Sequence, residues 1–169
     1  IEKYTDDENI DRIEMRFPYN KKVIQLIRCM KDKRGLPGMY AVYDGEKKKW
    51  TFKTEMAIEA PPLLYGGQVI VGSTDGFLYS IDQHKGKLNW KYETMGEIMG
   101  AANQANRPKT KDDVLVVGSY DNFVHCVETK SGKLLWKFEA QNYINGVPTI
   151  YREEFVVFGG CDAMLYVIS

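Results

Sequence analysis

The chain contains nearly the same stretch of sequence twice and the start of it a third time. The first copy covers residues 71–93 and the second covers 117–139, and each carries a tryptophan four residues after a glycine. A third copy begins at Phe158 and the sequence ends within it, at Ser169. Short strands that recur every 40 to 46 residues are typical of a propeller, in which each repeat forms one blade.

Each repeat is expected to form four short antiparallel strands. In one repeat the predicted strands are 58–64, 68–71, 77–81 and 87–92, and in the next they are 98–102, 114–117, 123–127 and 133–138. The last repeat offers 144–150, 155–158 and 164–168 and lacks its outer strand. Asp75-Gly76 predicts a hairpin turn with positive φ, and Asn122 takes the place of the glycine in the following copy.

An earlier repeat precedes these. Residues 39–42 and 47–52 match the last two strands of a blade, with Ala41 to Trp50 one residue shorter than Ser80 to Trp90. Residues 12–17 and 23–28 are predicted as its first two strands, although 23–30 also shows helical spacing. Residues 6–8 are expected to be a solvated end. The predicted units are therefore 10–53, 57–93, 97–139 and 143–169 within one domain, 1–169, with the insertion 104–113 at the rim.

Composition limits the possible partners. The 169 residues are 44% hydrophobic and 27% charged with a formal net charge of zero, so no overall field draws the chain to nucleic acid or to an anionic membrane. Its apolar runs are far shorter than the roughly 20 residues of a membrane span. Three scattered cysteines (Cys29, Cys126 and Cys161) predict no disulfide framework and weakly favour a reducing, cytoplasmic compartment.

The repeated motif resembles the PQQ-like (quinoprotein-type) β-propeller repeat, in a form similar to the BamB-like outer-membrane-assembly propellers. Ser80, Gly86 and Trp90 match the family pattern. Cys126, Gly132 and Trp136 match it again, and Trp50 matches it with the shortened turn. The resemblance implies an all-β fold of four-stranded antiparallel blades in which these tryptophans dock between neighbouring blades. It also implies a periplasmic or extracellular location.

About four repeats give an incomplete ring, because an open arc leaves apolar blade faces uncovered. Two explanations remain open. The chain is an excerpt of a longer polypeptide that supplies the remaining blades, or two copies form one ring as a homodimer. The excerpt is favoured, because the sequence ends in the middle of a blade.

Enzymatic chemistry finds little support in the sequence. The resemblance implies that a quinoprotein dehydrogenase would hold PQQ and calcium with the help of adjacent cysteines, and no two cysteines are adjacent here. Neither catalytic nor metal-binding residues are assigned, no cofactor is evident, and PQQ enters only by analogy with the family. Cys126 and Cys161 are expected to be small buried residues rather than redox sensors.

Other recurring residues have structural explanations that outweigh functional ones. Aspartates 75, 121 and 162 are expected to cap their own turns rather than form a carboxylate ring. Tyr40, Tyr79, His125 and Tyr166 are aligned as packing residues rather than as a ligand cage. His84 and the lysine-rich segments 31–34 and 47–49 are expected in solvated turns.

The sequence therefore predicts a non-catalytic scaffold or binding module for a protein or ligand partner. The alternative is a fragment of a PQQ-dependent or other enzyme whose catalytic residues lie outside this chain.

Overall fold

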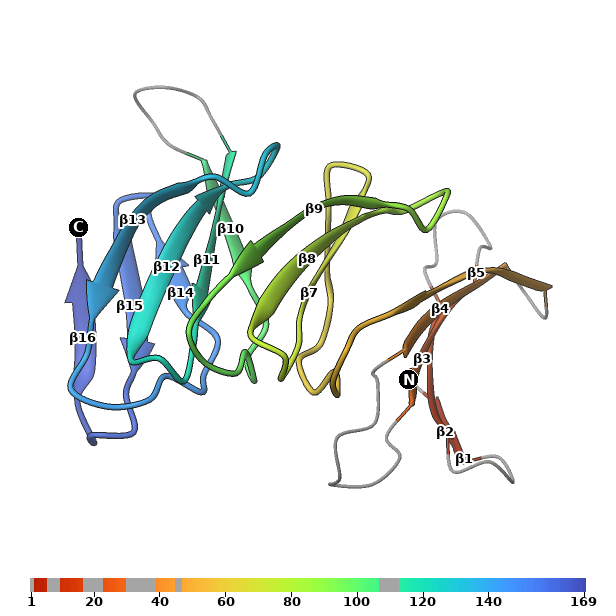
Figure 1. Cartoon of the computed structure of the whole chain (residues 1–169), viewed down its shortest axis with the longest axis horizontal. Coiled ribbons are helices and arrows are strands. Elements are labelled where there is room, and N and C mark those ends of the chain that lie inside the picture. Colours follow the sequence, from red (N-terminus) through yellow and green to blue (C-terminus); the bar gives the residue numbers. More distant parts are fainter. Residues whose placement is uncertain (1, 6–9, 17–22, 30–38, 45–46, 107–112) are drawn as a thin grey trace.

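The computed structural model describes residues 2–5, 10–16, 23–29, 39–44, 47–106 and 113–169, with side chains from residue 48 onward. These residues form four antiparallel sheets that stand side by side along the chain (Figure 1). Consecutive strands are neighbours within every sheet, as in the blades of a propeller. The predicted all-β fold of antiparallel blades is confirmed. The described part contains no helix that could cross a membrane.

We number the sheets as blades 1 to 4 in chain order. Blade 1 contains β1 (Glu2–Thr5), β2 (Ile10–Arg16), β3 (Val23–Cys29), β4 (Met39–Asp44) and β5 (Lys47–Lys53). Blade 2 contains β6 (Leu63–Tyr65), β7 (Gln68–Gly72), β8 (Phe77–Asp82) and β9 (Leu88–Glu93). Blade 3 contains β10 (Asn103–Asn106), β11 (Asp113–Gly118), β12 (Phe123–Glu128) and β13 (Leu134–Glu139). Blade 4 contains β14 (Thr149–Tyr151), β15 (Phe155–Gly159) and β16 (Leu165–Ile168).

The inner strands of blades 2 to 4 begin about five residues later than predicted. Ile58, Ile98 and Ile144 were expected to start them, but all three lie in the connection that precedes the strand. The amide of Ile98 donates to the carbonyl of Ser73, and that of Ile144 donates to Ser119, both at 3.1 Å. These isoleucines are nevertheless at most 3% exposed. The prediction of strand was wrong because their burial comes from packing between blades rather than from a sheet.

Blade 1 differs from the prediction in two respects. β1 was not predicted, and it makes this sheet one strand larger than blades 2 and 3. The helical alternative for 23–30 is wrong for 23–29, because β3 is a strand paired on both sides. Residues 6–8 lie outside the described part of the chain.

The alignment of blade 1 with the later blades also needs correction. Val42 lies opposite Trp50, as Ser80 lies opposite Trp90. Ala41 therefore takes the place of Tyr79, and Tyr40 does not, so the shared position proposed for Tyr40 is wrong. The β4–β5 hairpin is two residues shorter than the later ones, rather than one.

The predicted insertion 104–113 is partly strand. Residues 104–106 belong to β10 and pair with β11, which begins at Asp113. Its middle, 107–112, lies outside the described residues. The predicted turn conformation is confirmed, since Gly76 and Asn122 have φ of 84° and 73°. Ala163 occupies the same turn position in blade 4 with φ of 62°.

The core lies between blades rather than inside them. On β7, Val69 and Val71 pack in one cluster with Trp50, whereas Ile70 between them packs in the next cluster with Trp90. This alternation follows from the two-residue period of a strand. Blades 2 and 3 are thus apolar on both faces, and each face is covered by a neighbour.

Candidate functional site

Two tryptophans join successive blades in the same way. The Trp50 indole Nε1 of blade 1 donates to the carbonyl of Gln83, and Trp90 Nε1 of blade 2 donates to that of Thr129, both at 3.0 Å. Each acceptor lies in the hairpin turn of the following blade. Both tryptophans are 9% exposed. Each indole is therefore satisfied by the next blade while its ring is buried against it.

The turn that receives each tryptophan contains a glycine. Gly86 and Gly132 have φ of 66° and 69°, a region that favours glycine. A Cβ added to Gly86 would lie 2.5 Å from the Trp50 ring, and one added to Gly132 would lie 2.4 Å from the Trp90 ring. The structure therefore brings each tryptophan together with the glycine of the following repeat, not with the glycine of its own.

Ser80 and Cys126 lie inside their blades rather than at a docking turn. They pair across the strands with Trp90 and Trp136 respectively, and each sits at a register shift of its sheet. Ser80 is fully buried and Cys126 is 1% exposed, so a small side chain suits this position. Cys161, also expected to be buried, is exposed because it lies in a turn at the rim of blade 4.

Trp136 of blade 3 has a different environment from Trp50 and Trp90. It is 37% exposed and lines an open cavity of about 680 Å³ between blades 3 and 4. Apolar side chains, among them Phe138, Ile150 and Ile168, form much of its wall. Lys137, Glu153 and Glu154 add charge to it. The cavity is therefore an apolar groove beside an exposed indole.

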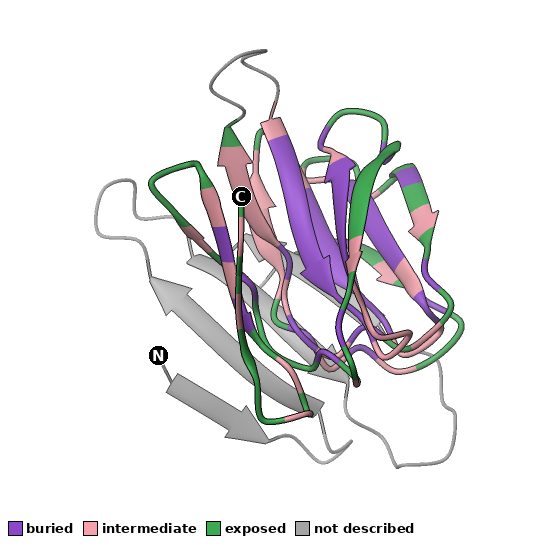
Figure 2. Ribbon diagram, turned by 90° about the vertical axis from the view of Figure 1, so that its left-hand side faces the viewer, coloured by how far each residue is buried: buried purple, intermediate pink, exposed green. Residues whose placement is uncertain are grey.

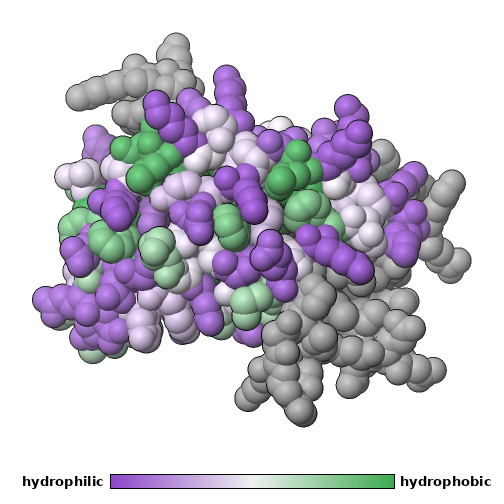
Figure 3. All heavy atoms as spheres, in the orientation of Figure 1, coloured by the Kyte–Doolittle hydropathy of each residue, from purple (hydrophilic) through white to green (hydrophobic). Residues whose placement is uncertain are grey.

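Blade 4 also presents an open edge. β16 pairs with β15, and no described strand pairs with its other edge. Leu165 is 71% exposed and Val167 is 59% exposed. Viewed from this end, blade 4 is mostly exposed or intermediate, and the buried strands lie behind it (Figure 2). The face seen in Figure 3 carries only separate hydrophobic areas among hydrophilic ones.

The recurring aspartates fasten the blades at one rim. Oδ1 of Asp75, Asp121 and Asp162 accepts the amide two residues ahead at 3.0 Å in every case. Oδ2 accepts an amide from the connection that enters the same blade, from Glu55, Met95 and Gln141 in turn, at 3.1 to 3.2 Å. The prediction that these residues cap their own turns is confirmed.

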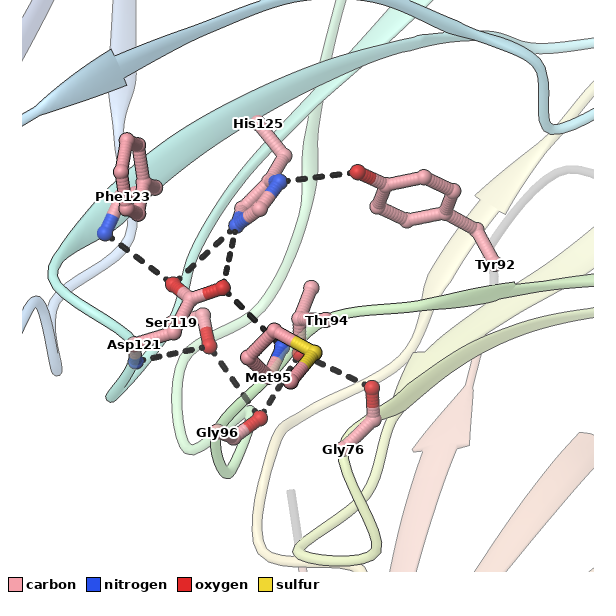
Figure 4. Close-up of polar contacts among 9 residues, drawn as sticks. All are labelled: Gly76, Tyr92, Thr94, Met95, Gly96, Ser119, Asp121, Phe123 and His125. Atoms are coloured by element: carbon pink, nitrogen blue, oxygen red, sulfur yellow. Dashed lines mark hydrogen bonds and ion pairs between the residues drawn. The ribbon is translucent and has the colours of Figure 1, made fainter.

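The aromatic or imidazole side chain four residues after each aspartate contacts its carboxylate. Tyr79 OH donates to Asp75 at 2.8 Å and Tyr166 OH donates to Asp162 at 2.6 Å. In blade 3 the ring is His125, whose Nε2 lies 3.0 and 3.1 Å from the two oxygens of Asp121. Its Nδ1 lies 2.9 Å from the hydroxyl of Tyr92 on blade 2 (Figure 4). Tyr79 and His125 are packing residues as predicted, at 5% and 2% exposure.

Hydrogen bonding and burial shift the pKa values of several of these groups. Burial opposes ionisation of Asp121, but hydrogen bonds from His125 and from the amides of Met95 and Phe123 outweigh it and lower its pKa to about 2. The Tyr166 hydroxyl and nearby amides lower the pKa of Asp162. Burial, followed by the charge of Asp121, raises the pKa of Tyr92. The carboxylates of Asp121 and Asp162 are held ionised as structural acceptors.

The site also contains a recurring contact between aromatic rings of neighbouring blades that was not predicted from the sequence. The residue two positions after each tryptophan is aromatic and packs edge-on against the ring of the next blade. The pairs are Phe52 with Tyr79, Tyr92 with His125, and Phe138 with Tyr166. This constant spacing from the tryptophan was the available signal.

Other candidates remain structural or solvated. His84 is exposed, as predicted, and its amide donates to Asp82. Lys48 and Lys49 are exposed as predicted, but the prediction of a turn is wrong, because residues 47–49 belong to β5. Residues 31–34 lie outside the described ranges. Within the described residues, no group of three or more His, Cys, Asp or Glu side chains could hold a metal ion.

Comparison with known proteins supports this architecture. A family model described as outer membrane protein assembly factor BamB matches residues 35–110 and again 99–166. No curated protein sequence matches the chain.

Solved structures share the fold at low sequence identity. BamB from Moraxella catarrhalis superposes with a TM-score of 0.69 and 16% identity, over 99% of this chain and 47% of that one. The chain thus spans about half the length of that protein. The computationally designed Ika4 protein superposes with a TM-score of 0.69 and 16% sequence identity, over 86% of this chain and 84% of Ika4.

Sqt1 from Chaetomium thermophilum was solved bound to the N-terminus of the ribosomal protein L10. It superposes with a TM-score of 0.71 and 14% sequence identity, over 85% of this chain and 40% of that one. At these identities the likeness shows the fold alone. The family model, however, matches most of the sequence, and its two matches follow the repeats described above. The chain therefore belongs to the BamB-like family of PQQ-like β-propeller repeat proteins.

Proposed function

We propose that the chain is a non-catalytic β-propeller scaffold that binds a protein partner, and that the edge of β16 in blade 4 accepts an extended strand. The observation that carries this proposal is the edge of β16 beside the exposed Trp136. A strand edge offers unpaired amides and carbonyls, and extended segments bind such edges by adding one strand to the sheet.

Blades 2 and 3 indicate which strand would suit this edge. In both, the third strand is followed by a turn with a left-handed glycine and then by an outer strand. That glycine lies under the tryptophan of the preceding blade, and a turn carbonyl accepts its indole N–H. A segment with a glycine turn followed by an alternating strand would fill the groove at Trp136 in the same way.

The polar groups of the rim favour a scaffold over an enzyme. Each recurring carboxylate is contacted by two backbone amides and by the ring of a residue on the third strand of the same blade. Groups held in this way stabilise the blades. Among the similar structures, Sqt1 was solved with a peptide segment of another protein, which supports a protein partner for a propeller of this kind.

A peptide with the sequence of residues 129–140 tests the proposal, because it carries the glycine turn and the outer strand of blade 3. Labelled with fluorescein, it should bind the chain saturably in an anisotropy titration. The same peptide with Gly132→Val should bind at least about tenfold more weakly, because a side chain there collides with the indole. Trp136→Ala in the chain should weaken binding of the parent peptide.

Equal binding of the two peptides, or no binding, would contradict the proposed site. The non-catalytic part of the proposal has its own measurement. The chain mixed with PQQ and calcium should not reduce an artificial electron acceptor, and reduction that depends on added PQQ would refute that part.

A further inference from the structure

Two tyrosines are stacked on the rim that carries the recurring aspartates, where blade 3 meets blade 4. Tyr120 lies in the turn between β11 and β12, and Tyr143 lies in the connection that leads into blade 4. Their ring centroids are 5.0 Å apart and their planes differ by 8°. Tyr143 is 49% exposed, so much of it remains open to solvent after stacking. The pair therefore presents a flat aromatic surface at this rim.

An exposed methionine lies beside this pair. Met95 is 89% exposed, and its amide donates at 3.1 Å to Asp121, the residue after Tyr120 (Figure 4). The amide of Tyr120 in turn donates to the carbonyl of Glu97, two residues after Met95, at 2.9 Å. Met95, Glu97 and Tyr120 thus belong to one part of the rim, in which exposed apolar groups adjoin an exposed acidic residue.

The other repeats show that the fold does not require these large side chains. In blades 2 to 4 the residue before each aspartate donates its amide to the same position of the entering connection, at 2.9 Å. These equivalent pairs are Thr74 with Ala57, Tyr120 with Glu97, and Cys161 with Tyr143. Glu55 and Gln141 likewise take the place of Met95. Glu97, the counterpart of Tyr143, is exposed with blades on both sides, so exposure belongs to the position itself.

Charge at this rim of blades 2 to 4 is of one sign. The rim, the lower one in Figure 1, consists of the three connections that enter these blades and the three turns that contain the aspartates. The structure describes all of these residues: 54–62, 94–102 and 140–148 in the connections, and 73–76, 119–122 and 160–163 in the turns. They include six Asp or Glu and no Lys, Arg or His. The rim therefore favours a cationic partner.

Two lysines on the neighbouring outer strands already lie over aromatic rings. Lys91 Nζ is 4.1 Å from the centroid of Phe77, and Lys137 Nζ is 4.1 Å from that of Phe123. Among the described residues, no cation of the chain lies over the Tyr120–Tyr143 pair in this way. The stacked pair is thus open to a cation that a partner supplies.

We infer that this surface binds an arginine-containing segment of a protein partner, with a guanidinium stacked on Tyr143, apolar contact at Met95, and charge balanced by Glu97 and the other carboxylates of the rim. A guanidinium is planar and stacks on aromatic faces, whereas the ammonium of lysine is a compact, strongly hydrated charge. The surface is separate from the β16 edge. The inference therefore goes beyond the proposed strand-binding site and does not depend on it.

A short fluorescein-labelled peptide of alternating glycine and arginine tests this inference, and the same peptide with lysine in place of arginine is its control. In an anisotropy titration the arginine peptide should bind saturably. It should bind roughly two- to fivefold more tightly than the lysine peptide, because stacking on an exposed ring adds about this much beyond charge. Added salt should weaken the binding of both peptides.

The decisive variant takes its residues from equivalent positions of blade 2, so that the fold is kept. Tyr143→Ala copies Ala57 and Tyr120→Thr copies Thr74. Together they should remove the preference for arginine and change binding of the lysine peptide little. Tyr151→Ala is the matched control, because Tyr151 is 51% exposed but lies beside the β14–β15 turn at the opposite rim. It should leave the binding of both peptides unchanged.

The acidic part of the surface has its own variant. Glu97→Gln removes one exposed carboxylate next to the aromatic pair and keeps the size of the side chain. It should weaken both peptides to a similar extent and reduce the dependence of binding on salt. The preference for arginine over lysine should remain, because the tyrosines are intact.

Equal affinity for the two peptides, or no saturable binding of either, overturns the inference. So does arginine binding that the Tyr143→Ala/Tyr120→Thr variant leaves unchanged, or that Tyr151→Ala weakens equally. A peptide of alternating glycine and proline that binds as tightly would assign the surface to an uncharged partner and would also overturn it.

The strand-binding site of the proposed function fails separately. The Tyr143→Ala/Tyr120→Thr variant should bind the 129–140 peptide as the parent chain does, and Trp136→Ala should bind the arginine peptide as the parent chain does. Loss of only one of the two activities in the parent chain therefore identifies which of the two sites is wrong.

Discussion

The indole N–H of Trp90 donates to the carbonyl of Thr129, 39 residues further along the chain, at 3.0 Å. The same ring lies directly over Gly132, which is three residues beyond that carbonyl. One side chain thus fixes the outer strand of blade 2 on the hairpin turn of blade 3. Trp50 repeats the relationship one blade earlier, with Gln83 and Gly86. Blades 1 and 2 are thus each fastened to the next blade by a buried indole, as expected for repeats that depend on contacts between neighbours.

Trp90→Ala should lower the free energy of unfolding by about 3–5 kcal/mol, because it removes a buried aromatic ring and leaves the Thr129 carbonyl without its donor. Trp136→Ala is the matched control. More than a third of Trp136 is exposed, so it should cost clearly less, about 1–2 kcal/mol. Urea unfolding of both variants gives the comparison. Equal losses would show that the tryptophans do not differ in their docking.

Gly132→Ala should destabilise by about 2–4 kcal/mol, since the position has a left-handed φ and a Cβ there collides with the Trp90 ring. Gly146→Ala provides the comparison, because nothing lies within 4 Å of a Cβ at that position. It should change the unfolding free energy by less than about 0.5 kcal/mol. Chemical denaturation of the two variants measures this difference. A tolerated alanine at 132 would contradict the close packing of the indole on the turn.

The Tyr92–His125 pair should behave as a coupled unit. Tyr92→Phe removes the hydroxyl that meets His125 Nδ1 and leaves a buried ring nitrogen without this partner, at a cost of about 1–2 kcal/mol. The double variant Tyr92→Phe/His125→Tyr recreates the Phe–Tyr pair found at the two neighbouring interfaces. It should therefore recover most of the loss, because the new hydroxyl can donate to Asp121 as Tyr79 donates to Asp75. A double-mutant cycle in urea reports the coupling, and additive losses would refute it.

Stability should fall in acid because of Asp121. Its folded pKa of about 2 lies below the ordinary value of 3.8, so the group stabilises the fold fully above pH 3.8 and progressively less as the pH falls towards 2. Nearby solvent screens part of this effect, so the contribution is about 1–2 kcal/mol. Urea midpoints between pH 2 and 6 measure it. In Asp121→Asn the urea midpoint should depend less on pH between 2 and 4. If its pH dependence is unchanged, the acid sensitivity comes from other groups.

The sequence predicted the repeat, the blades and the turns well, because these depend on local patterns. Alternating residues, the Asp-Gly turn and the glycine four residues before Trp90 and Trp136 all act within a few positions of one another. The inner strands were misplaced for the same reason. Ile98 has the character of a strand residue, yet its burial comes from Gly72 of the preceding blade, which a local pattern does not reveal.

The docking partners also lay beyond local reasoning. Trp90 and Gly86 share one motif, but the structure pairs Trp90 with Gly132 of the next repeat. Such pairing depends on how blades stack and not on the spacing within a repeat. The Tyr92–His125 pair, which takes the place of the Phe–Tyr pairs at the other interfaces, was hidden for the same reason. Each of the two residues fits its own strand, and only their contact between the blades explains both.

Hydrogen exchange at β16 tests most directly whether blade 4 has an open acceptor edge. The chain should be followed by mass spectrometry with and without the 129–140 peptide. The account predicts fast exchange across residues 164–168 in the free chain and clear slowing on addition of the peptide, with β8 and β12 unchanged. Exchange at β16 that is already slow in the free chain, or that the peptide leaves unaltered, would contradict an acceptor edge on blade 4.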